Sequence, residues 1–103
     1  LADSDQIIAY ESDDATSSYL AEKLHETRKI TKAWIAQKIV QYYPEYPVLV
    51  IVIECNHLFV NEMTLIEQLN NQLHLGCAFF VISKKGPYPS LAKQICALND
   101  RII

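Results

Sequence analysis

A hydrophobic run near the middle of the chain ends in a carboxylate. Six consecutive apolar residues extend from Val48 to Ile53, and Glu54 follows directly. Because the run is rich in β-branched residues and far too short for a membrane span, it predicts a strand buried on both faces, as in the parallel sheets of α/β proteins. The pattern therefore places Glu54 at the carboxyl end of a central strand, where open α/β sheets bind their ligands.

An amphipathic segment and a second apolar run follow this strand. Asn61 or Thr64 can cap a helix here. The apolar spacing predicts that the buried face of this helix consists of Met63, Ile66, Leu69 and Leu73. Gly76, three residues after the last of these, is expected to end the helix as its C-cap. The next strand is then predicted at Cys77–Ile82.

The first third of the chain predicts a short strand and a long helix. Ile7–Tyr10 is a brief apolar run, and Asp13 or Asp14 can cap the helix that follows. Apolar residues at helical spacing continue to Tyr43. A single helix over 14–43 would be about 45 Å long at 1.5 Å per residue, longer than one sheet can cover, so we expect a break near 27–31.

Strands and helices alternate along the predicted order. A third helix is expected after the polar turn at 83–89, with Leu91, Ile95 and Leu98 along one face. Because connections of this kind place parallel strands next to each other, we expect an α/β fold: a three-layer sandwich with a mainly parallel sheet. Residues 101–103 look like the start of another strand. We therefore expect residues 1–103 to be one α/β domain, cut from a larger one.

Composition and charge narrow the possible functions. The chain has 103 residues, of which 50% are hydrophobic and 20% charged, a balance that predicts a globular domain. Its net charge is −3, and its nine Lys and Arg form no basic run, which argues against direct nucleic-acid binding. The acidic amino end and the absence of a long apolar stretch predict a cytoplasmic segment without membrane contact. Three cysteines without metal-ligand spacing are expected to be buried free thiols: Cys55, Cys77 and Cys96.

Four polar residues follow the two main strands of the predicted sheet. Glu54 ends the first strand, and Ser83, Lys84 and Lys85 end the second. In a nucleotide hydrolase, an acid at this position would hold magnesium through water or orient the attacking water, and the hydroxyl or cation would sense the terminal phosphate. The alternative is that all four are solvated strand ends, and spacing alone favours that alternative.

From the central strand onward, the chain resembles an ATPase domain of the FtsK/SpoIIIE translocase type, closest in spacing to those of type VII secretion motors (the EssC/EccC proteins). In that family, an apolar strand ends in the Walker B aspartate, then come a helix, a Leu-Gly junction and a strand ending in Ser or Thr. Here the same order is Val48–Glu54, a helix, Leu75-Gly76, and a strand ending in Ser83. Arg101-Ile102 fits the strand start that the family has after its next helix.

Several residues depart from the family pattern. Glu54 stands where the family has Asp, Cys55 and Asn56 stand where an active motor has a second acid, and Lys85 replaces an Arg. The Gly-rich Walker A segment does not occur in these 103 residues. The resemblance therefore implies half of a P-loop domain that is degenerate and hydrolyses little or no nucleotide.

The resemblance also implies a role, a cofactor and partners. It makes Glu54 the catalytic (Walker B-like) position and Ser83, Lys84 and Lys85 the nucleotide-sensing positions. ATP and Mg²⁺ would belong to the parent protein, and the chain alone is expected to hold no cofactor or metal. The expected role is assembly, regulation or substrate docking in a translocation or secretion motor, with neighbouring ATPase domains or protomers and a secreted protein as partners.

Two other functions compete with this one. The first is a free-standing receiver-like or pseudo-receiver signalling module, in which Glu54 would mimic a phosphorylated aspartate and Lys84 would be its lysine partner. Such a module needs five strands, and the pattern predicts three and the start of a fourth. The second is a small independent hydrolase that uses Glu54, for which the spacing offers no partner residues.

Overall fold

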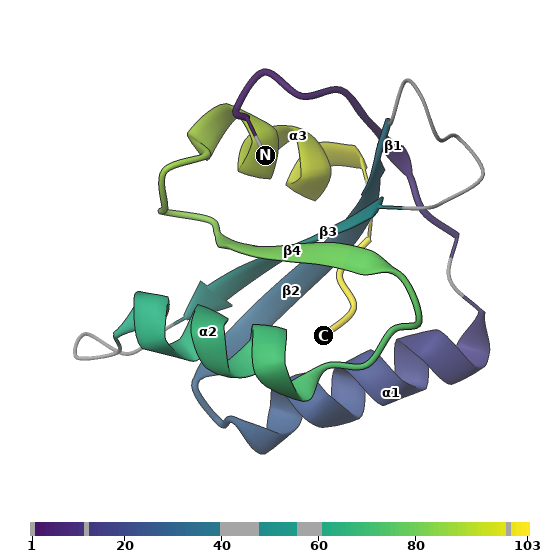
Figure 1. Cartoon of the computed structure of the whole chain (residues 1–103), viewed down its shortest axis with the longest axis vertical. Helices are drawn as coiled ribbons and strands as arrows, with labels where there is room; N and C mark the ends of the chain where they lie inside the picture. The colour runs from purple at the N-terminus through teal and green to yellow at the C-terminus, as the bar shows by residue number, and fades with distance from the viewer. Residues whose placement is uncertain (1, 12, 40–47, 56–60, 99) are drawn as a thin grey trace.

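The structure is a computed structural model that describes residues 2–11, 13–39, 48–55, 61–98 and 100–103. Within these ranges, the chain forms four strands and three helices (Figure 1). In chain order they are β1 (Ile7–Ala9), α1 (Asp14–Glu26), β2 (Ile30–Lys38), β3 (Val48–Cys55), α2 (Glu62–Gln72), β4 (Ala78–Ser83) and α3 (Pro89–Leu98), so that β2 and β3 are consecutive. The predicted strands at 7–10, 48–53 and 77–82 and the helices after them are confirmed.

The described strands form one mixed sheet in the order β1-β2-β3-β4. β3 and β4 are parallel, as the sequence predicts, but β2 is antiparallel to both β1 and β3. The prediction of a mainly parallel, P-loop-like sandwich is therefore wrong. The reason is that residues 30–38 form a central strand, where the hydrophobic spacing predicts a continued helix.

β2 has no alternation of buried and exposed side chains, and this explains the wrong prediction. Residues 33–36 are all buried, because helices cover both faces of the sheet. Ile35 packs on the α1 and α2 side and Trp34 on the α3 side. The expected break near 27–31 is confirmed, since α1 ends at Glu26 and Arg28 turns the chain with φ +57°. The end of the predicted helix at 40–43 lies outside the described residues.

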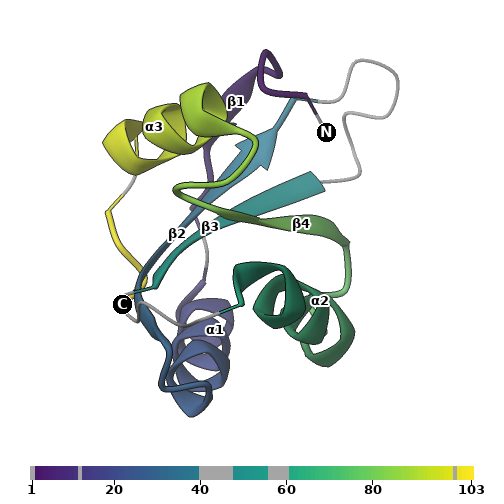
Figure 2. The ribbon, with the colours of Figure 1, turned by 90° about the vertical axis from the view of Figure 1, so that its left-hand side faces the viewer.

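The sheet separates two hydrophobic cores. α1 and α2 lie on one face and α3 on the other, which Figure 2 shows edge-on. The first core contains Leu20, Leu24, Ile30, Ala33, Ile35, Leu49, Ile51, Ile53, Leu65, Leu69, Leu73 and Val81. The second contains Trp34, Ala36, Val50, Val52, Ile82, Leu91, Ala92 and Ile95. β3 contributes side chains to both cores. Because each fully buried Leu or Ile stabilises the fold by roughly 1.5–3 kcal/mol, packing on both faces holds β3 in place.

Side-chain caps fix where α1 and α2 begin. The carboxylate of Asp13 accepts a hydrogen bond from the Thr16 N–H (2.7 Å), and the amide oxygen of Asn61 accepts one from the Thr64 N–H (3.2 Å). Both caps satisfy amides that have no partner inside the helix. The prediction that Gly76 caps the end of α2 is wrong, because α2 ends at Gln72 and Leu73 is its C-cap. Gly76 has φ +74°, a conformation that favours glycine, and turns the chain into β4.

The buried face of α2 differs in part from the predicted one. Leu69 and Leu73 are buried as expected, but Leu65 takes the place of Met63, whose side chain is 68% exposed. Ile66 is half-buried and packs at the rim of the first core. The face is therefore rotated slightly from the one that Met63 implied.

Candidate functional site

The carboxyl ends of β3 and β4 lie side by side in the sheet. The two strands are parallel neighbours, and their register aligns Ile53 with Ser83. α2, which follows β3, lies on one face of the sheet, and α3, which follows β4, lies on the other (Figure 2). Open α/β sheets bind their ligands outside the carboxyl ends of parallel strands, so this edge is the place to look for a site.

Glu54 lies between two lysines at this edge. Lys84 Nζ is 3.9 Å from Glu54 Oε1, and Lys32 Nζ is 3.9 Å from Glu54 Oε2. Both separations are too long for hydrogen bonds. Glu54 Oε2 is buried, although the side chain as a whole is 25% exposed, and it has no hydrogen-bond partner among the described residues. Among the described residues, Lys32 and Lys84 hold the carboxylate through charge, and neither ammonium group spends a hydrogen bond on it.

Lys32 was not predicted as a site residue, because its segment was expected to be helical. The antiparallel pairing of β2 with β3 makes Lys32 the register partner of Glu54. The neighbouring Thr31 hydroxyl donates a hydrogen bond to the Glu54 carbonyl oxygen (3.0 Å) and joins the two strands where their register shifts. Only recognition of 30–38 as a strand, through its β-branched Ile30 and Thr31, could have indicated this residue.

Trp34 positions Lys84 from the α3 side of the sheet. The Lys84 ammonium lies 5.4 Å from the centre of the Trp34 ring, within the range of a cation–π contact. Trp34 itself is buried in the second core. The ring therefore offers a fixed surface that limits where the mobile end of Lys84 can lie.

Ser83 and Lys85 do not join this cluster through their side chains. Ser83 is buried, and its hydroxyl donates a hydrogen bond to the carboxylate of Glu62 at the start of α2. The same hydroxyl accepts one from the Lys85 N–H (3.2 Å), and the Lys85 side chain is exposed. Ser83 thus ties β4 to α2. Of the four predicted site residues, the structure brings only Glu54 and Lys84 side chains together.

The surroundings of this edge are basic in an otherwise acidic chain. Four ammonium groups lie at the start of β2 or the end of β4, and two carboxylates at the end of β3 or the start of α2. They are Lys29, Lys32, Lys84 and Lys85, and Glu54 and Glu62, a net charge of +2 against −3 for the whole chain. Because a locally positive edge attracts anions, its sign favours an anionic ligand.

The cysteines are free thiols that are half-buried rather than fully buried as expected. Burial raises the pKa of Cys55, and the nearby Glu62 and Glu54 carboxylates raise it further. Burial also raises the pKa values of Cys77 and Cys96. A raised pKa keeps each sulfur in its protonated, poorly nucleophilic form. In the part of the chain that the structure describes, His, Cys, Asp and Glu form no group of three that could hold a metal.

Comparison with protein-family models, curated protein sequences and solved structures gives no match to this chain. The resemblance to translocation motors therefore stays a prediction. Among the described residues, no helix has the length and hydrophobicity to cross a bilayer.

Proposed function

We propose that this chain is a binding module that recognises an anionic group, a phosphate or carboxylate of a small molecule, at the carboxyl ends of β3 and β4. The observation that supports this most is the arrangement of Lys32 and Lys84 on either side of Glu54, both at 3.9 Å, at the carboxyl ends of two parallel neighbouring strands. The lysines bring positive charge to the place where this kind of sheet binds ligands.

Binding would use the donors that the lysines do not spend on Glu54. An anion on the solvent side of the two ammonium groups can accept charge-assisted hydrogen bonds from them, at roughly 2.7–2.9 Å. These bonds would be shorter than the 3.9 Å ion pairs that the lysines make with Glu54. The Lys84 and Lys32 side chains are 42% and 45% exposed, so both can reach such a ligand. Glu54 keeps the two like charges together in the empty site but repels an anion once it is bound. Its net effect on affinity is therefore unfavourable.

The test is a titration of the isotope-labelled chain with inorganic phosphate and with citrate, followed by amide chemical shifts at constant ionic strength. Lys84→Ala and Lys32→Ala should each weaken binding about tenfold or more, because a hydrogen bond to a charged group contributes roughly 1.5–3 kcal/mol. Glu54→Gln should tighten it, since the substitution removes the repulsion. Lys93→Ala, an exposed lysine on α3, is the matched control and should change nothing.

Two results would refute the proposal. One is equal binding by the wild-type chain and both lysine variants. The other is an equal loss in Lys93→Ala, which would mean that only overall charge matters.

The motor-domain function is the second candidate, and one observation favours it. β3, α2 and β4 follow the order that the resemblance describes, with Glu54 and Lys84 at one edge. The antiparallel β2 gives it no support. Titration with ATP and Mg²⁺ separates the candidates. A motor domain should bind ATP through its nucleoside as well as its phosphates, whereas the proposed module should bind inorganic phosphate without any nucleoside. No observation favours the receiver-like alternative, since four strands rather than five form the sheet in the described residues.

A further inference from the structure

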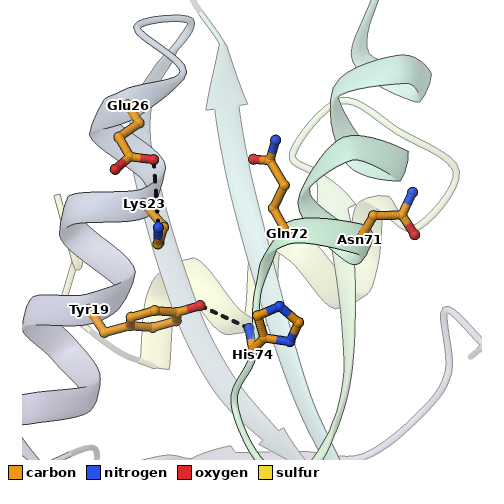
Figure 3. A pocket seen from close by; sticks show the side chains of 6 residues that line it. All are labelled: Tyr19, Lys23, Glu26, Asn71, Gln72 and His74. Atoms are coloured by element: carbon orange, nitrogen blue, oxygen red, sulfur yellow. Dashed lines mark hydrogen bonds and ion pairs between the residues drawn. The ribbon is translucent and has the colours of Figure 1, made fainter.

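A polar groove lies between α1 and α2, on the face of the sheet opposite α3 (Figure 3). Its volume is about 660 Å³, within the range of small-molecule sites. One wall is a single stripe of α1, because Tyr19, Lys23 and Glu26 are spaced four and three residues apart. The other wall is the end of α2 and the residues after it, with lining side chains Asn71, Gln72 and His74.

Tyr19 is fixed across the groove by a hydrogen bond. The backbone N–H of His74 donates to the Tyr19 hydroxyl oxygen (2.9 Å), as Figure 3 shows. The hydroxyl hydrogen remains available, because it has no acceptor among the described residues. Lys23 Nζ lies 3.9 Å from Glu26 Oε2 and 5.9 Å from the centre of the Tyr19 ring. The groove thus combines an aromatic ring held in place with side chains that keep most of their hydrogen-bonding capacity.

The charges and hydrogen-bonding groups of the groove favour one class of ligand. The formal charges of Lys23 and Glu26 cancel. The carboxylate would repel an anionic ligand and the ammonium would repel a cationic one, so the groove favours an uncharged ligand. The remaining lining groups are a phenol, two carboxamides and an imidazole, which offer donors and acceptors side by side. Hydroxyl groups match such a lining, because each one both donates and accepts.

A peptide suits this groove less well. Peptide-binding grooves supply either an unpaired strand edge or apolar pockets for side chains. Here the walls are two helices whose backbone groups are largely bonded within each helix. The Tyr19 ring can instead cover the C–H face of a sugar when the flexible Lys23 side chain, whose ammonium lies over the ring at 5.9 Å, moves aside. Its hydroxyl can then bond a sugar hydroxyl at the rim. We infer that this groove is a carbohydrate-binding site, independent of the anion site at the ends of β3 and β4.

The experiment is an amide chemical-shift titration of the whole 103-residue chain with maltose and with cellobiose. The expected result is saturable shifts at Tyr19, Gln72 and His74 with one or both sugars, at millimolar concentrations. Tyr19→Phe removes only the hydroxyl, and Gln72→Ala removes one carboxamide. Each should weaken binding about two- to tenfold, as expected for the loss of one or two neutral hydrogen bonds.

Matched controls are available in the same chain. Gln68→Ala lies on the exposed side of α2 outside the groove, and Tyr88→Phe lies on the α3 side of the sheet; both should bind like the wild type. Three outcomes would overturn the inference: no saturable shift with either sugar, unchanged affinity in both groove variants, or preferential binding of trialanine at the same residues. Binding of phosphate at Lys84 has no bearing on this site, so the two proposals can fail separately.

Discussion

We expect the double substitution Ala36→Cys and Val50→Cys to form a disulfide between β2 and β3. The two residues are register partners in an antiparallel pair, and both are fully buried. Directly opposed Cβ atoms in such a pair lie roughly 4.5–5.5 Å apart, close to the roughly 3.5–4.5 Å of a disulfide. The three native cysteines would be replaced by serine so that only this pair can form.

The stabilisation follows from the length of chain that the cross-link closes. Residues 36 to 50 form a loop of 15 residues, which corresponds to a gain of about 3 kcal/mol in the free energy of unfolding. With a urea dependence of roughly 1–3 kcal/mol per molar, the midpoint should rise by roughly 1–3 M. Oxidised and reduced forms of the same variant are compared, because the packing cost of the substitutions then cancels.

The assay is thiol counting by mass spectrometry after alkylation, with urea unfolding followed by circular dichroism. The control pairs Ala36→Cys with Ile51→Cys, since Ile51 is one residue along β3 and faces the opposite side of the sheet. It should remain reduced. A disulfide in the control and none in the Ala36–Val50 pair, or no stabilisation on oxidation, would refute the antiparallel register.

Three further predictions concern stability and reactivity. Leu69→Ala should lower the free energy of unfolding by about 2–5 kcal/mol, whereas Met63→Ala on the same helix should change it little; urea denaturation measures both. Hydrogen bonds from Thr16 lower the pKa of Asp13 below 3.8 in the folded protein. The contribution of ionised Asp13 to the free energy of unfolding is therefore full above pH 3.8, and it is lost as the pH falls through the pKa of the folded state. Asp13→Asn should remove this part of the acid dependence of unfolding. Finally, the three thiols should alkylate faster in urea than in the native state at about pH 8, because burial raises their pKa values.

Sequence patterning located the parts of the fold that carry a strong local signal. The apolar run at 48–53 could only be a strand buried on both faces, and Gly76 marked the turn into β4. β2 could not be predicted in the same way. Its buried residues, Ala33 to Ala36, are consecutive because three helices cover both sides of the sheet, so strand alternation does not separate it from a helix. The only local signal is the β-branched pair Ile30 and Thr31 at its start, which is too short to decide between the two.

The candidate site was predictable to the same extent as the strands. Glu54 and Lys84 follow two parallel neighbours, and the rule that such ends meet at one edge placed them correctly. Lys32 depends on antiparallel pairing, and Tyr19 and His74 depend on how α1 packs beside α2. These are long-range contacts, for which the spacing of residues in one sequence gives no signal.

The position of Trp34 gives the protein a built-in optical reporter. It is the sole tryptophan in the chain, the residue is 6% exposed, and the centre of its ring lies 5.4 Å from the Lys84 ammonium. Indole emission responds to a nearby charge and to contact with water, so movement of Lys84 toward a bound anion would change its intensity, and unfolding would shift its wavelength. Fluorescence of the unlabelled protein can therefore follow both occupancy of this edge and the integrity of the second core.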